Sequence, residues 1–277
     1  MTTSAYSSAA RARALPLLRA AHIGPSLAVT CVVALLAFGR GLPVNRGVAV
    51  TAAVFAGQLT IGWGNDLLDA ARDRQVGRTD KPLAAGELKA STVQACLAAA
   101  GCACVVLSFL VGWRSAMVHL CLGVGSGHAY NLILKRTAWS WLPYAVAFGT
   151  LPAVVTLADL PPGWPPAWMW VSAGALGVAA HFLNALPDLA ADEATGVRGL
   201  PHRLGAAASR AVATALLVGA SVVAALGPGS AGPWVWAALA SVAGLSVVAL
   251  AGPARRPFQA AVAIALVVVL LLTFGAA

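Results

Sequence analysis

The chain has 277 residues, of which 60% are hydrophobic and only 10% are charged, and its formal net charge is +9. A soluble domain of this size needs far more polar surface, and disordered chains are poor in apolar residues, so the composition excludes both classes. Only nine residues are Asp or Glu, and the positions of these few acids are therefore informative.

Apolar stretches long enough to cross a bilayer recur along the chain, since about 20 helical residues span the hydrocarbon core. They cover residues 22–39, 46–64, 91–112, 115–131, 139–158, 167–186, 209–226, 233–251 and 257–275. The sequence predicts an all-α integral membrane protein with nine transmembrane helices in a single bundle. Residues 1–19 are expected to form a cytoplasmic N-terminal tail, and residues 20–277 the membrane domain.

The basic residues predict the orientation of these spans. The tail and one set of alternate loops carry all the Lys and Arg residues except Arg40, Arg46 and Arg114. Because cytoplasmic loops are enriched in Lys and Arg, we expect that side to face the cytoplasm of a multi-pass protein, in a bacterial cell membrane. This asymmetry accounts for the net charge, so no nucleic-acid partner is expected.

A first group of acids follows the second span, in a stretch predicted to be a cytoplasmic loop. Its core reads Asn65-Asp66-x-x-Asp69-x-x-x-Asp73, and Asp80 and Glu87 follow. If the span continued as a helix, the three core aspartates would lie within about 60° of one another around its axis. Three carboxylates on one helix face repel each other unless a cation lies among them.

A second group follows the sixth span, again on the predicted cytoplasmic side. It contains Asp188, Asp192 and Glu193, and Asn184 precedes it. Asp188 and Asp192 are four residues apart and would share a helix face. Eight of the nine acids thus lie in two loops, and acids near a membrane that otherwise lacks them are functional candidates.

Oxygen ligands from carboxylates and amides suit Mg²⁺, which takes one or two carboxylates together with substrate phosphates. The candidate metal ligands are Asn65, Asp66, Asp69, Asp73, Asp188 and Asp192. The alternative is that these acids are solvated charges paired with neighbouring arginines. Two groups that each have a leading Asn and helically spaced aspartates favour the metal site.

Basic residues accompany both groups, as binding of a diphosphate requires. Arg72, Arg78 and Lys81 lie among the acids of the first group, and Arg198 follows the second. Lys135 lies in the remaining cytoplasmic loop, five residues after Tyr130, where it can reach a mouth of the bundle.

These residues resemble the UbiA superfamily of intramembrane prenyltransferases over roughly residues 15–275. The first aspartate motif of that family matches Asn65, Asp66, Asp69 and Asp73, and the second matches Asp188 and Asp192. Similar stretches are Lys81-Pro82-Leu83-Ala84-Ala85-Gly86, where Lys replaces the Arg of the family, Tyr130 to Lys135, and Gly196 to Gly205.

The resemblance implies a central cavity in which Mg²⁺ and an isoprenyl diphosphate bind between the two motifs. The catalytic residues would be Asp66, Asp69, Asp188, Asp192 and Lys135. The substrate-binding residues would be Asn65, Arg72, Arg78, Lys81, Tyr130, Asn184, Arg198 and His22. For His22, a purely structural role as a hydrogen-bonded histidine at the start of a helix is an equally good interpretation. The partners would be the lipid bilayer, the diphosphate and a small acceptor, aromatic or other.

Two other functions stay open at this point. A UbiA-type terpene cyclase would use the same metal apparatus to close a C15 or C20 diphosphate on itself, and spans poor in polar side chains suit it. Transfer is nevertheless the commoner activity in the superfamily. A transporter with a cytoplasmic cation site ranks last, since transport predicts acids or broken helices near the midplane.

Overall fold

The computed structural model describes residues 15–194, 196–229, 231–251 and 256–274, so most of the predicted N-terminal tail lies outside the described residues. Within these ranges the chain is helical and contains no strand. The elements are α2 (Ile23–Gly39), α3 (Val44–Gln75), α4 (Ala90–Leu110), α5 (Trp113–Met117), the π-helix η1 (Val118–Val124), α6 (Gly125–Leu132), the 3₁₀-helix η2 (Leu134–Arg136), α7 (Leu142–Thr156), α8 (Ala167–Ala185), α9 (Leu189–Ala194), α10 (Leu200–Leu226), α11 (Pro233–Ala251) and α12 (Arg256–Phe274).

The helices confirm a multi-pass membrane protein. Five of them, α3, α4, α10, α11 and α12, are long and apolar enough to cross a bilayer, and α2 and α7 are apolar but shorter. Each predicted span overlaps one helix, except residues 115–131, where α5, η1 and α6 follow one another. The count of nine transmembrane helices stays a prediction.

The first aspartate motif does not lie in a loop, as predicted, but on the last turns of α3, which runs from Val44 to Gln75. Hydropathy falls after residue 64, yet helix-forming residues such as Leu67 and Ala70 carry the helix on. The helix stops where Gly77 adopts a left-handed conformation with φ +71°, as is common just past a helix end. The long helix therefore holds the acids at fixed angles.

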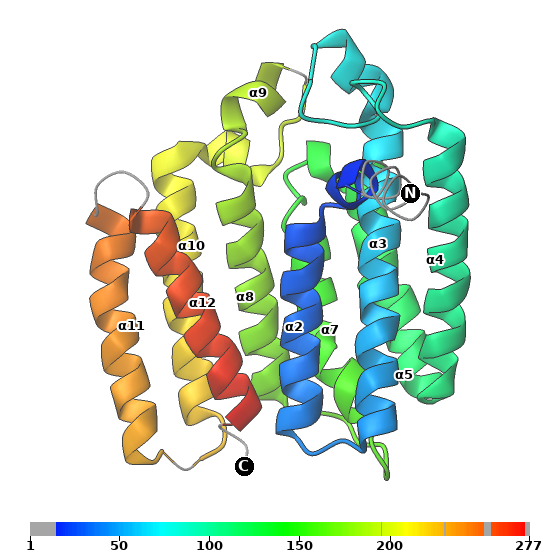
Figure 1. Ribbon diagram of the computed structural model, residues 1–277. Coiled ribbons are helices and arrows are strands. Elements are labelled where there is room, and N and C mark those ends of the chain that lie inside the picture. The colour runs from blue at the N-terminus through cyan, green and yellow to red at the C-terminus, as the bar shows by residue number, and fades with distance from the viewer. Residues whose placement is uncertain (1–14, 195, 230, 252–255, 275–277) are drawn as a thin grey trace, which may run out of the picture.

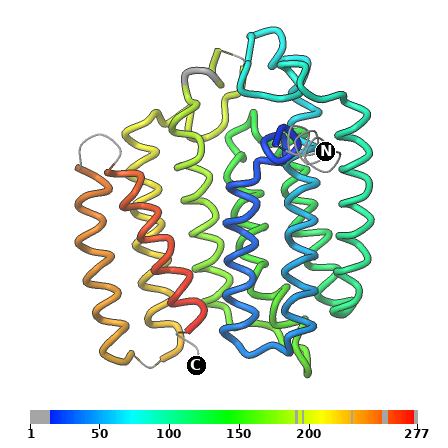
Figure 2. Tube along the Cα trace, in the orientation of Figure 1, coloured from blue at the N-terminus to red at the C-terminus, as the bar shows by residue number. Residues whose placement is uncertain are grey.

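The helices form a closed bundle with α4 and α11 on its flanks (Figure 1). The chain trace brings the last helix, α12, beside the first described long helix, α2, and these two helices are in contact (Figure 2). Fully buried side chains from distant helices, such as Leu36, Phe182, Leu217 and Ile264, form the core on this side. The bundle thus closes around an interior that several helices line.

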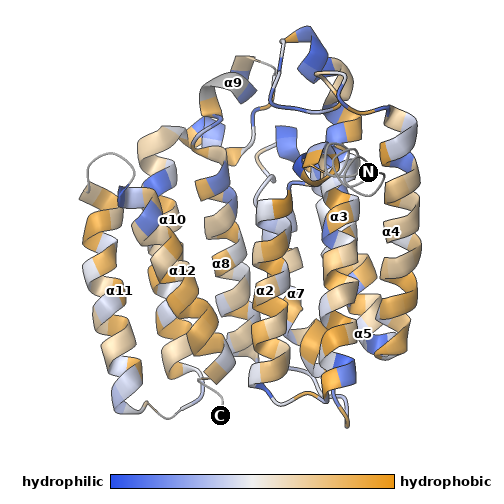
Figure 3. Cartoon of the chain, viewed as in Figure 1, coloured by the Kyte–Doolittle hydropathy of each residue, from blue (hydrophilic) through white to orange (hydrophobic). Residues whose placement is uncertain are grey.

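The polar residues gather at one end of the bundle. Figure 3 shows mainly apolar helices through the middle, with hydrophilic segments at the end where α9 and the connection after α3 lie. That end carries both aspartate motifs, because α3 finishes there and α9 follows α8 there.

Candidate active site

A cavity of about 640 Å³ lies inside the bundle and joins the polar end to the apolar interior. Along α3 its lining runs from Val54 to Asp73, which corresponds to about 28 Å of helix. The inner walls are apolar side chains of α2, α3, η1 and α7, and they include Val29, Ile61, Val124, Phe148 and Leu151. The cavity therefore offers one charged end and one apolar chamber.

Asp69 and Lys135 form a buried ion pair at the charged end. Lys135, on η2, places its Nζ 2.6 Å from Oδ1 and 2.8 Å from Oδ2 of Asp69. The two side chains are only 7% and 8% exposed. Burial lowers the pKa of Lys135, and its hydrogen bond to Asp69 opposes that shift. Arg72 lies 3.2 Å from both Asp69 and Asp73, so each of these acids has a cationic partner.

Asp66 occupies a different environment from the other acids of its motif. It is 1% exposed and is not among the residues that line the cavity. Its Oδ1 accepts a hydrogen bond of 3.1 Å from Lys81, whose Nζ also lies 2.9 Å from Nε2 of His22. Its Oδ2 is buried and has no hydrogen-bond partner among the described residues. His22 and Lys81 themselves line the cavity.

A glycine on α3 permits this arrangement. A Cβ at Gly62 would overlap the carbonyl oxygen of Ala21, so the chain before α2 can approach α3 only because Gly62 has no side chain. His22 follows with φ 51°, an uncommon conformation for a residue other than glycine. This close approach is what brings His22 to the first motif.

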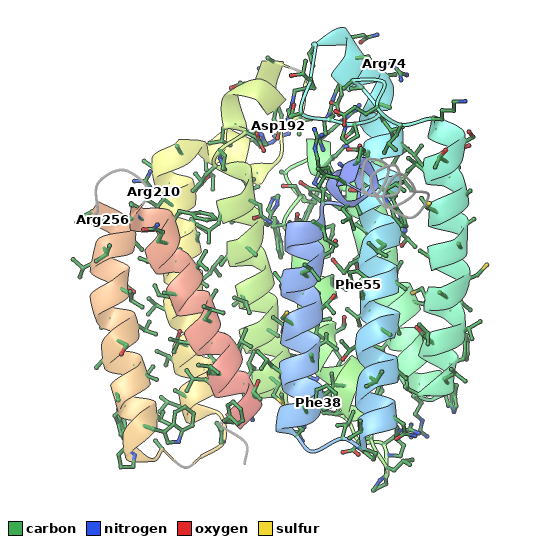
Figure 4. The ribbon with its side chains drawn as sticks, viewed as in Figure 1. Phe38, Phe55, Arg74, Asp192, Arg210 and Arg256 are labelled. Carbon is green, nitrogen blue, oxygen red and sulfur yellow. The ribbon has the colours of Figure 1, made fainter. Side chains whose placement is uncertain are left out.

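The second motif faces the first from α8 and α9. Asp188 lies in the turn between these helices and Asp192 on α9, and both line the cavity with Asn184. Burial raises the pKa of Asp192. Nε2 of His202, from α10, lies 3.4 Å from Oδ2 of Asp192. Figure 4 places Asp192 at the same end of the bundle as Arg74, which follows the first motif on α3.

The connection after α3 adds a further charged pair to the cavity lining. Arg78 contacts Asp80 at 2.7 Å, and this hydrogen bond raises the pKa of Arg78 and lowers that of Asp80 to about 2. The sequence did not predict a role for Asp80 or His202, since neither belongs to a motif of regularly spaced acids. Arg198 does not line the cavity; it pairs with the exposed Glu193 at 3.3 Å.

Aromatic rings line the cavity next to its charged end. The ring of Tyr144 lies 5.2 Å from that of Tyr130 and 4.7 Å from that of His181, and it stacks on Phe148 at 6.4 Å. Ser140 hydrogen-bonds to His181, with its Oγ 2.9 Å from Nε2 of the histidine. These rings present π faces and edges between the acids and the apolar chamber.

The residues fit a site for Mg²⁺ that substrate phosphates complete. In the described part of the chain, no three His, Cys, Asp or Glu side chains converge closely enough to hold a metal ion by themselves. Mg²⁺ needs only one or two carboxylates when phosphate oxygens and waters supply the rest. Carboxylates line the cavity from both sides, and buried Nη1 of Arg72 has no hydrogen-bond partner among the described residues, so it can receive an anionic oxygen.

Comparison with known proteins agrees with this fold. The model of the UbiA prenyltransferase family matches residues 26–266. A comparison with curated protein sequences finds no match.

Several solved structures are similar to this chain. A UbiA homologue from Aeropyrum pernix K1, solved without ligand, has a TM-score of 0.69 at 18% identity over 88% of this chain and 94% of its own. A homologue from Archaeoglobus fulgidus, solved with GPP and Mg²⁺, has a TM-score of 0.68 at 14% identity over 94% and 98%. A structure of digeranylgeranylglyceryl phosphate synthase has a TM-score of 0.64 at 17% identity over 95% and 98%. At such identities these likenesses show the fold.

Proposed function

Since this chain belongs to the UbiA prenyltransferase family, we propose that it is a Mg²⁺-dependent intramembrane prenyltransferase acting on an isoprenyl diphosphate. The observation that carries the proposal is the polarity of its cavity. Acids and bases line one end, and apolar walls continue inward from it. An isoprenyl diphosphate has the same division between an anionic head and a hydrocarbon chain.

The charged end would bind the diphosphate head. Asp69, Asp73, Asp188 and Asp192, with the amides of Asn65 and Asn184, would hold Mg²⁺ and phosphate oxygens between α3 and α9. When bound, Mg²⁺ neutralises charge on the diphosphate as the C–O bond breaks. Asp66 would act from outside the cavity by fixing Lys81 and His22 at its edge.

The cations would hold the departing pyrophosphate. Lys135, Arg72, Arg78 and Lys81 line the cavity at this end and supply N–H donors for its oxygens. Nη1 of Arg72 already lacks a partner among the described residues, and Arg78 would exchange Asp80 for a phosphate oxygen. The electron pair of the broken C–O bond leaves with the pyrophosphate.

The rings below the acids would protect the allylic cation. Tyr130, Tyr144 and Phe148 line the cavity where C1 of the prenyl chain would lie, and aromatic faces stabilise a nearby cation. Apolar walls exclude the water that would otherwise capture it. The acceptor forms a bond to C1 and loses a proton, which completes the transfer.

We place the charged end at the cytoplasmic face, because the Lys and Arg residues of the chain concentrate on that side. The water-soluble diphosphate and Mg²⁺ would then reach the site from the cytoplasm, while the hydrocarbon product would leave to the bilayer. A transporter is disfavoured, since both aspartate motifs lie at one end rather than near the middle of the bundle.

The test is to incubate the purified protein with C10, C15 and C20 diphosphates and Mg²⁺, with and without candidate acceptors. Pyrophosphate release and mass analysis of products are measured together. Acceptor-dependent prenylated products are expected. A terpene formed without any acceptor would instead identify a cyclase, and absence of enzyme-dependent pyrophosphate release under every condition would refute prenyl-diphosphate chemistry.

A further inference from the structure

The apolar chamber contains a histidine whose hydrogen bonds fix the state of its ring. His119, on η1, is 3% exposed and lines the cavity. Its Nδ1 lies 2.8 Å from Oγ of Ser108, and that Oγ lies 2.6 Å from the carbonyl oxygen of Cys104. A hydroxyl has one hydrogen, and a carbonyl oxygen only accepts, so the Ser108 proton points to Cys104. Ser108 must therefore accept a hydrogen bond from Nδ1–H of His119.

The other ring nitrogen is left as an acceptor. A buried charge without an ionic partner is unfavourable, so the ring is neutral and Nε2 carries a lone pair. Nε2 has no hydrogen-bond partner among the described residues. It lies beside α3, since a Cβ placed on Gly57 would be 3.2 Å from it. The missing side chain of Gly57 leaves room for the ring edge.

A second polar group without a partner lies on α3, one residue after Gly57. Gln58 lines the cavity, and within the described ranges its amide makes no hydrogen bond. It is 7 residues before Asn65 and 11 before Asp69, so all three lie on one face of the helix. Gln58 is therefore about 10 Å below Asn65 and about 16 Å below Asp69 along the axis. The pair formed by His119 and Gln58 is separate from the diphosphate end.

The chemistry of this pair selects its occupant. A hydrocarbon chain placed here would bury the His119 lone pair and the Gln58 amide without partners, which is unfavourable. An anionic group is also excluded, because the Lys and Arg residues among the described cavity lining, Arg72, Arg78, Lys81 and Lys135, belong to the other end. A neutral group that donates a hydrogen bond satisfies both side chains.

We propose that His119 and Gln58 bind the acceptor of the transfer reaction, and that this acceptor is a neutral molecule with a hydroxyl group. The hydroxyl donates to Nε2 of His119, and the Gln58 amide donates to the hydroxyl oxygen. The inference rests on the proposed function, because it takes the charged end for the diphosphate. The acceptor then extends from this pair towards C1 along α3 and η1, past Ile61 and Val124, and the apolar walls of α2 and α7, such as Val29 and Leu151, are left to the prenyl chain.

The test uses 2-naphthol and 2-methoxynaphthalene as probes, because a methyl group replaces the hydroxyl hydrogen in the second and removes the only hydrogen-bond donor. Binding to the full-length protein in detergent is followed by probe fluorescence, with empty micelles subtracted. Wild type is expected to bind the naphthol about tenfold more tightly than the ether, as one net hydrogen bond predicts. His119→Leu and Gln58→Leu are each expected to abolish that preference.

His128→Leu is the matched control. His128 lines a different, smaller pocket with Thr60 and Cys104, so this variant should keep the tenfold preference. Thermal unfolding reports whether each variant is folded. If His119→Leu does not fold, Gln58→Leu still tests the site. Equal binding of the two probes to wild type, or a preference that survives in the folded variants, would overturn the acceptor site. Pyrophosphate release by wild type is measured separately, so failure of the proposed function is distinguishable.

Discussion

Replacing Lys135 with Met is expected to destabilise the protein by about 3 kcal/mol, because Asp69 would keep its buried charge without its main partner. The two side chains are 7% and 8% exposed, and Nζ lies 2.6 Å from the nearer carboxylate oxygen. Breaking such a buried pair costs about 3–5 kcal/mol, and Arg72, 3.2 Å from Asp69, should keep the loss at the low end of that range.

The assay is denaturant unfolding in detergent micelles without divalent cations or diphosphate. The double variant Lys135→Met with Asp69→Asn removes both charges, so it should regain most of the lost stability. Pyrophosphate release should nevertheless stay lost in both variants, since the side chains that would hold the diphosphate and the metal are gone.

Glu193→Gln provides the control for an exposed pair. Glu193 and Arg198 are 57% and 66% exposed, so this change should alter stability by less than about 1 kcal/mol. If Lys135→Met proves as stable as Glu193→Gln, or if the double variant is no more stable than Lys135→Met alone, Lys135 does not stabilise the fold by neutralising the buried charge of Asp69.

Three further changes test other parts of the site. Asp192→Asn should slow Mg²⁺-dependent pyrophosphate release by about 100-fold or more. Full turnover would show that Asp192 does not take part in the reaction. Gly62→Ala should cost about 1–3 kcal/mol in thermal unfolding, because its Cβ would overlap backbone of the segment before α2, whereas Gly101→Ala, inside α4 with open space around it, should cost nothing and stabilise the helix by up to about 1 kcal/mol. Ser108→Ala should cost about 1–3 kcal/mol, since it leaves buried Nδ1 of His119 unpaired; an unchanged unfolding midpoint would show that the ring finds another partner.

Hydropathy located most helices but not the end of α3. The apolar pattern stops near residue 64, and the polar residues that follow resemble a loop when they are averaged over a window. The helix continues to Gln75 because its residues are good helix formers and because one of its faces lines the interior of the bundle. For α3, hydropathy therefore reports the apolar part of the helix rather than its full length.

The spacing of the acids indicated a shared helix face, but it treated Asp66 and Asp69 alike. In the fold, Asp69 lines the cavity beside Lys135, while Asp66 is directed at Lys81 and His22. The angle between two side chains follows from helix geometry alone. Which neighbour each one meets depends on elements 15 to 66 residues away in the chain.

The sequence by itself determined the membrane class, the family resemblance, the two aspartate motifs and Lys135, because composition, apolar length and residue spacing are local properties. Only the tertiary structure decided which of these residues share one cavity and which other residues join them. His119 and Gln58 line the same cavity, and His202 reaches Asp192, because packed helices bring together side chains that no spacing relates.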